Sequence, residues 1–158
     1  MAKMMDIKDE TYAGEQKVYE CIESNLPDEV ICYYNREING KQFDFCLLIE
    51  HMGMLIIEVK GWNYSNIIRV INPDTIETNL YSNPVGSPKK QARSYKFALV
   101  NTCNNKYCIN PLVMDMVCYP FLSENEYRHC GLNIVSEPEF TLFKEDIENP
   151  MKFAKKIA

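Results

Sequence analysis

Two acidic residues and a lysine, placed around two apolar stretches, are the residues of this sequence best suited to chemistry. Asp44 lies in the stretch QFDFCLLIE; thirteen residues separate it from Glu58 in LIIEVKGW, where Lys60 follows. Both stretches are rich in the apolar and aromatic residues that favour strands. Two carboxylates beside an ammonium group can hold Mg²⁺, a hard cation that binds through one or two carboxylates, water and a substrate phosphate.

The two stretches predict a β-hairpin that turns at residues 51–53. If the residues that flank this turn pair, Asp44 lies opposite Lys60, and Glu58 is its diagonal neighbour at roughly 7–8 Å along the backbone. Because side chains alternate between the faces of a strand, all three side chains then share one face. The opposite face is predicted to meet the core through Phe43, Phe45, Leu47, Leu55, Ile57 and Val59.

The same three side chains also have a purely structural interpretation, a cross-strand salt bridge on the surface of the sheet. Exposed pairs of this kind are common and contribute little to stability. Spacing alone does not separate this interpretation from a metal site. A one-residue shift in register would also move Asp44 to the other face.

Composition narrows the class of protein. The 158 residues are 46% hydrophobic and 25% charged, as expected for a single globular domain over residues 1–158 with a real core. No apolar run approaches the ~18 residues of a membrane span, and the polar start MAKMMDIKDE lacks a signal-peptide core. We therefore expect a cytoplasmic protein without a membrane segment. The net charge of −5 does not indicate a basic nucleic-acid-binding surface, but a metal site needs acidic residues.

Seven cysteines, an odd number, lie partly in strand-like stretches and are expected to be reduced core thiols. A zinc site is the alternative interpretation. Cys103 and Cys108 are separated by four residues, and His129 and Cys130 are adjacent, but none of these forms a CxxC pair.

The order of elements predicts an α/β domain with a central mixed sheet flanked by helices. Helices are predicted over residues 11–24, 88–100 and 144–158, the second with Ser87 as its N-cap and Pro88 in its first turn. Strands are predicted over residues 30–35, 42–50, 54–60, 66–71, 75–80, 112–119 and 131–135, with a hairpin turn at Asn39-Gly40. The last helix has no clear cap, which suggests that the natural chain continues beyond Ala158.

These pieces, in this order, resemble the nuclease-related domain (NERD) family of the PD-(D/E)XK nuclease superfamily. The resemblance covers about residues 11–119 and rests on Gly14-Glu15, Leu26-Pro27-Asp28, Asp44, Ile57-Glu58-Val59-Lys60, Gly61-Trp62 and Gln91. It implies a restriction-endonuclease-like core. It also implies a nuclease that uses Mg²⁺ or Mn²⁺ to hydrolyse phosphodiester bonds, with DNA as the expected substrate.

The resemblance also implies roles for single residues. Asp44 and Glu58 would bind the metal ion, with the Val59 carbonyl as a third ligand. Lys60 would be the catalytic lysine. Glu15 would complete the metal site, usually through a water molecule.

The predicted second helix carries Gln91 and Tyr95 four residues apart, and therefore on one face. In related exonucleases this pair lies near the active site and the DNA. The same helix is the most basic segment of the chain, which is either a solvated face or a track for DNA phosphates. Its basic residues are Lys89, Lys90, Arg93 and Lys96.

Two positions depart from the family pattern. Phe43 replaces a proline that the superfamily often carries, and Phe45 replaces a histidine found in many NERD sequences. The core residues are present, so we expect activity. The alternatives are a nucleic-acid-binding module that does not cut and a protein-interaction module on the same fold. The family further suggests a downstream helicase or another DNA-processing module.

Overall fold

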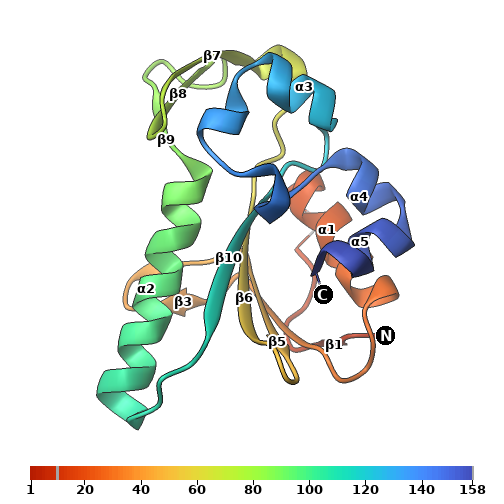
Figure 1. Ribbon diagram of the computed structural model, residues 1–158, viewed down its shortest axis with the longest axis vertical. Coiled ribbons are helices and arrows are strands. Elements are labelled where there is room, and N and C mark those ends of the chain that lie inside the picture. The colour runs from red at the N-terminus through yellow and green to blue at the C-terminus, as the bar shows by residue number, and fades with distance from the viewer. Residues whose placement is uncertain (10, 158) are drawn as a thin grey trace.

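A central mixed sheet organises the protein, described here from a computed structural model that covers residues 1–9 and 11–157. Among these residues the sheet has six strands in the order β1-β2-β5-β6-β10-β11 (Figure 1). The strands β2, β5 and β6 are antiparallel, whereas β1–β2, β6–β10 and β10–β11 are parallel pairs. Their bounds are Lys3–Met4 (β1), Ile31–Tyr34 (β2), Phe45–Ile49 (β5), Gly53–Val59 (β6), Val113–Cys118 (β10) and Thr141–Leu142 (β11).

Helices cover both faces of this sheet, which confirms the predicted α/β class. Helix α2 lies along one face, and α1, α4 and α5 cover the other (Figure 1). The helices are α1 (Ala13–Asn25), α2 (Pro88–Tyr107), α3 (Glu124–His129), α4 (Lys144–Glu148) and α5 (Pro150–Ile157). The short 3₁₀ helices are η1 (Tyr64–Asn66), η2 (Leu132–Ile134) and η3 (Pro138–Phe140).

Two small sheets accompany the central one. A hairpin of β3 (Glu37–Ile38) and β4 (Lys41–Gln42) turns at Asn39-Gly40, where both residues have positive φ, as the sequence predicts. A three-stranded sheet of β7 (Ile67–Asn72), β8 (Thr75–Thr78) and β9 (Val85–Gly86) lies with α3 near one end of the central sheet (Figure 1).

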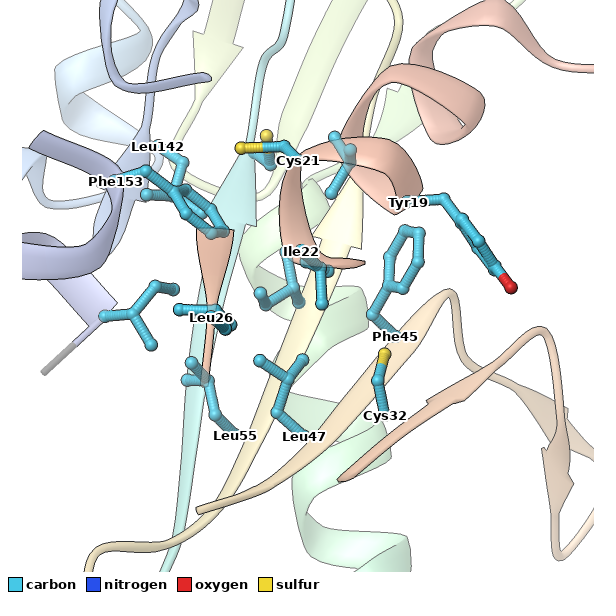
Figure 2. Packing of buried hydrophobic residues seen from close by; sticks show 14 of the residues in the cluster. Tyr19, Cys21, Ile22, Leu26, Cys32, Phe45, Leu47, Leu55, Leu142 and Phe153 are labelled. Carbon is cyan, nitrogen blue, oxygen red and sulfur yellow. The ribbon is translucent and has the colours of Figure 1, made fainter. Parts of the chain in front are cut away.

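The main core lies between the central sheet and α1, α4 and α5. Ile22 of α1 is fully buried and points toward Phe45, Leu47 and Leu55 of the sheet (Figure 2). Phe153 of α5 joins the same cluster, also without exposed surface. Each such side chain contributes about 1.5–3 kcal/mol through burial, so this face fixes α1 and the central strands relative to one another.

A second cluster packs α2 against the opposite face. It contains Phe43, Cys46, Ile56, Ala92 and Val113. Phe43 was predicted on the other face with Phe45, and that prediction was wrong. The chain is not one strand over residues 42–50, because it bends at residues 43–44 between β4 and β5 and the alternation of side chains breaks there.

Three further predicted elements differ from the structure. Helix α2 begins as predicted, with the Ser87 side chain accepting a hydrogen bond from the Lys90 backbone N–H, but continues to Tyr107. The predicted helix over residues 144–158 is two helices, because Pro150 lacks an N–H and starts a new one; Ala158 lies outside the described residues. Residues 131–135 contain the 3₁₀ helix η2 instead of a strand, after Gly131 with φ of 84°.

The hairpin of β5 and β6 has a register two residues away from the predicted one. Ile49 pairs with Gly53, and Phe45 pairs with Ile57. His51 takes a φ of 67° in the tight loop between the strands. A shift of two preserves the face of each side chain, but it places Asp44, one step beyond the last pair, opposite Glu58 instead of Lys60.

No helix in the described part of the chain is both long and apolar enough to cross a bilayer.

The register of the hairpin depends on Gly53, which gives a first prediction. Its φ is 109°, and a Cβ added there would lie 2.4 Å from the Leu112 carbonyl oxygen. We expect Gly53→Ala to lower the free energy of unfolding by roughly 2–4 kcal/mol, measured by urea denaturation. Gly86→Ala is the matched control, because a Cβ at Gly86 meets no atom within 4 Å and its φ is not positive. Equal stability of the two variants would contradict this account of the turn.

Candidate active site

A cleft of about 690 Å³ opens where β5 begins and β6 ends. Its walls come from the start of α1, the ends of these two strands, the loop around β9 and the first turn of α2. Six of the predicted site residues line it: Glu15, Asp44, Glu58, Val59, Lys60 and Gln91. The fold therefore brings together residues that lie as far as 76 positions apart in the chain, from Glu15 to Gln91.

Asp44 is anchored by the neighbouring strand. The Val59 backbone N–H donates a hydrogen bond of 2.8 Å to its Oδ2. The Asp44 carbonyl in turn accepts a hydrogen bond from the Asn35 N–H, so both the side chain and the backbone of this residue are held. A carboxylate fixed in this way keeps one orientation as it enters the cleft.

Glu58 occupies the next-to-last position of β6 and is almost completely buried, with 5% of its surface exposed. The Lys60 Nζ lies 3.6 Å from Glu58 Oε1, and a quarter of the Lys60 side chain remains exposed. The lysine thus faces the cleft while its charge lies beside the buried glutamate. The surface salt bridge considered from the sequence does not describe this pair, because Glu58 lies inside the protein.

Glu15 reaches the cleft because α1 begins very close to the end of β6. A Cβ added to Gly14 would lie 3.1 Å from the Gly61 Cα, so the two backbones approach without side chains between them. This approach places Glu15, in the first turn of α1, within hydrogen-bonding reach of Asp44. Three carboxyl groups therefore converge from three segments of the chain.

Burial and mutual repulsion dominate the electrostatics of these carboxyls. Burial, followed by the charge of Asp44, raises the pKa of Glu15 to about 8 and that of Glu58 to about 8. Burial also raises the pKa of Asp44, although the Val59 N–H and the Lys60 charge oppose this. Without a cation the cleft retains protons that exposed carboxyls would lose, a pattern that often marks functional sites.

The donor atoms of the cleft fit a hard divalent cation. Glu58 Oε2 and Gln91 Oε1 are buried oxygens without a hydrogen-bond partner among the described residues. In that same part of the chain, no three His, Cys, Asp or Glu side chains are arranged as a complete metal centre. Mg²⁺ does not require one, since it commonly binds through one or two carboxylates and completes its shell with water and substrate oxygens. Asp44, Glu58 and the carbonyl of Val59 could supply the protein ligands.

Gln91 and Tyr95 follow one face of α2, as predicted, but only Gln91 lines the cleft. Tyr95 is half-buried against the cluster between α2 and the sheet. Burial, with the charges of Glu58 and Asp44 next in importance, raises the pKa of Tyr95 to about 12. Its hydroxyl therefore lies within the field of the cleft and remains protonated at neutral pH.

The four basic residues singled out on α2 lie away from the cleft, and within the described part of the chain Lys89 and Lys96 have an acidic partner. The Lys89 Nζ lies 2.8 Å from Asp115 Oδ2, and the Lys96 Nζ lies 4.0 Å from Asp115 Oδ1. Asp115, on β10, is thus a buried counter-charge that ties α2 to the sheet. Lys90 and Arg93 are exposed and line a separate cavity of about 500 Å³ beside η2. Their assignment to nucleic-acid binding remains a prediction.

Several residues that line the cleft were not singled out from the sequence. Asn35 and Gln42 are joined by a 2.7 Å hydrogen bond between their side chains, and Tyr12 and Tyr81 lie at more exposed positions. Asn35 is the last residue of the strand predicted over residues 30–35, and this position at a strand end was a usable signal. Tyr81 lies in an irregular segment after β8, where no periodicity marks a functional position.

A mixed sheet between helices, with the cleft at the ends of its central strands, is consistent with a nuclease-like core. The model of the NERD family, the nuclease-related domain, matches residues 10–120. The chain belongs to this family. No match was found among curated proteins or among solved structures.

The raised pKa of Glu58 gives a second prediction, on stability without metal. The folded protein keeps a proton that the unfolded chain releases between about pH 4.5 and about pH 8, so stability falls as pH rises through this window. In EDTA, Glu58→Gln should therefore melt about 3–6 °C higher than the parent near pH 8, with little difference near pH 5. Differential scanning calorimetry near pH 5 and near pH 8 measures the melting temperatures of the variant and the parent.

Glu29→Gln is the control for this experiment, because Glu29 is exposed. Its melting temperature should follow that of the parent at both pH values. A Glu58→Gln variant that is less stable than the parent near pH 8 would show that the buried carboxyl is not under electrostatic stress.

Proposed function

We propose that this chain is a divalent-metal-dependent nuclease of the PD-(D/E)XK type that hydrolyses phosphodiester bonds in DNA. The observation that carries the proposal is the convergence of Asp44, Glu58 and Lys60 in one cleft, at the end of β6. Membership of the nuclease-related domain family supports it independently. The buried oxygens of Glu58 and Gln91, which have no partner in the part of the chain that the structure describes, give a physical reason for a cation in this cleft.

In this proposal Asp44, Glu58 and the Val59 carbonyl hold Mg²⁺ or Mn²⁺, and Glu15 supports the ion through water. When bound, such an ion polarises the phosphoryl group and makes hydroxide more available at neutral pH. The residues of the chain prepare the site for it. The Val59 N–H fixes Asp44, and the approach of α1 through Gly14 brings Glu15 close to Asp44.

Lys60 acts on the attacking water and on the phosphate. Its ammonium group, positioned by Glu58 Oε1 at 3.6 Å, can donate hydrogen bonds to the water and to a phosphate oxygen on which negative charge develops. Gln91, whose buried Oε1 has no hydrogen-bond partner among the described residues, can accept a hydrogen bond from the same water. These contacts orient the nucleophile, and the exposed part of Lys60 leaves the substrate a path to it.

Cleavage of DNA by purified protein tests the proposal. Linear, nicked-circular and single-stranded DNA are incubated with Mg²⁺, Mn²⁺ or EDTA, and products are resolved on gels. Cleavage should require the metal ion, and Asp44→Asn and Lys60→Ala should each lower the rate by about 10²–10⁴ while remaining folded. Lys152→Ala, an exposed lysine of α5, is the control that should cut like the parent.

Metal-dependent cleavage that survives both substitutions would place the chemistry elsewhere. Absence of cleavage on every substrate, with all proteins folded, would favour a nucleic-acid-binding or protein-interaction module that does not cut.

A fourth prediction concerns the exposed cations of α2. If Lys90 and Arg93 contact phosphates of DNA outside the cleft, their joint replacement by alanine should weaken binding equally for different sequences. It should also reduce the slope of log K against log salt by about 1.5. Fluorescence anisotropy at several salt concentrations measures this slope. An unchanged slope, equal to that of Lys152→Ala, would identify the pair as an ordinary solvated surface.

A further inference from the structure

Two exposed tyrosines stand at the cleft that holds the carboxyl groups. Tyr12 immediately precedes α1 and is 61% exposed, and Tyr81 follows β8 and is 60% exposed. Both line the same cleft as Asp44 and Glu58, and Leu80, half exposed, lies beside Tyr81. Neither tyrosine ring contacts another aromatic ring or a cation within residues 1–9 and 11–157. Much of the surface of both side chains is therefore available to a ligand.

The charges of the cleft disfavour a ligand bound through its phosphates. Among the described residues that line it, Glu15, Asp44 and Glu58 are acidic and Lys60 alone is basic. Duplex DNA is held chiefly by contacts of Lys and Arg with phosphates along both strands, and these walls offer no such track. Even with a bound divalent cation, attraction for phosphate is confined to one point of the cleft. Binding must gain its remaining free energy from another source.

Aromatic stacking is that source in proteins that bind single strands, because every base has a face that can stack on a tyrosine ring. Bases are accessible in this way only where they are not stacked within a duplex. We propose, on the basis of the nuclease function proposed above, that the cleft takes a single-stranded segment of DNA. Bases stack on Tyr12 and Tyr81, and the phosphate between or beside them reaches Lys60.

The two tyrosines lie on separate elements, at the start of α1 and beyond the end of β8. Tyr12 is joined to the catalytic side of the cleft through Gly14 and Glu15, three residues further along the chain. A base that stacks on Tyr12 therefore contacts a residue only three positions before a carboxyl group of the site. The tyrosines determine which form of DNA is accepted, whereas the carboxyls and Lys60 act on the phosphate.

The experiment compares two labelled single strands that differ only in their bases. One is a short oligothymidylate, and the other is an abasic strand with the same number of phosphates. Fluorescence anisotropy in EDTA keeps the probes intact, so the measurement reports binding without cleavage. We expect the protein to bind oligothymidylate at least about tenfold more tightly than the abasic strand, and more tightly than a duplex of the same length.

Variants then assign the difference to the two rings. Replacing Tyr12 and Tyr81 together by alanine should reduce affinity for oligothymidylate to that for the abasic strand, whereas Tyr12→Phe with Tyr81→Phe should retain it. Tyr107→Ala is the matched control, because Tyr107 is 58% exposed and lies at the far end of α2. Its affinities should equal those of the parent.

Equal affinity of the parent for the two single strands, or tighter binding of the duplex, would overturn the inference without any variant. The same holds if the alanine pair still prefers oligothymidylate. A base-dependent preference that is lost in the alanine pair supports the inference even if Mg²⁺ produces no cleavage, in which case the proposed nuclease function alone fails. Cleavage without any base preference would support the proposed nuclease function and overturn the inference about the two tyrosines.

Discussion

The hydrogen bond from the Val59 N–H to the Asp44 carboxylate holds the cleft together. The ladder between β5 and β6 ends at the pair of Phe45 and Ile57, and Asp44 lies beyond it in a bend. Its side chain takes the place of a backbone acceptor for the next N–H of β6. The carboxylate consequently cannot turn outward to water without leaving a backbone donor unpaired, which costs about 1–3 kcal/mol when the donor is buried.

Burial, together with the fixed position of Asp44, raises the pKa of the two neighbouring glutamates. Glu58 is buried opposite Asp44, and Glu15 approaches from α1, so three acidic groups gather where water screens charge poorly. Burial and mutual repulsion raise the pKa of Glu15 and Glu58, because ionising these groups in the cleft is unfavourable. A protein can keep such a cluster when the rest of the fold is stable enough to hold it. Here the apolar core between the sheet and α1 supplies that stability.

Much of this arrangement could be predicted from the sequence, for identifiable reasons. The hydrophobic pattern of β6 and the position of Lys60 after it are local signals, and the N-cap at Ser87 is likewise local. The register of the hairpin was not predictable, because it depends on the contact of Gly53 with the backbone of Leu112, a residue far along the chain. The prediction of the face on which Phe43 lies was wrong, because the bend after β4 interrupts the alternation of side chains that the prediction assumed.

The partner of Asp115 also needed the structure. An acidic residue in an apolar strand indicates a buried counter-charge, but only the packing of α2 on β10 shows that Lys89 and Lys96 provide it. The same packing separates these lysines from the cleft, whereas the sequence left open either a solvated face or a track for DNA phosphates. Helical periodicity places residues on a face, and the partner of that face is a tertiary property.

The contact of Gly14 with Gly61 restricts how related sequences can vary. When two large side chains meet in a core, growth of one can be offset by shrinkage of the other. Two glycines in backbone contact have no atoms to remove, so an added methyl group at Gly14 finds no compensating change at Gly61. A side chain at Gly14 would force the two backbones a few tenths of an ångström apart, and Glu15 would shift with the start of α1.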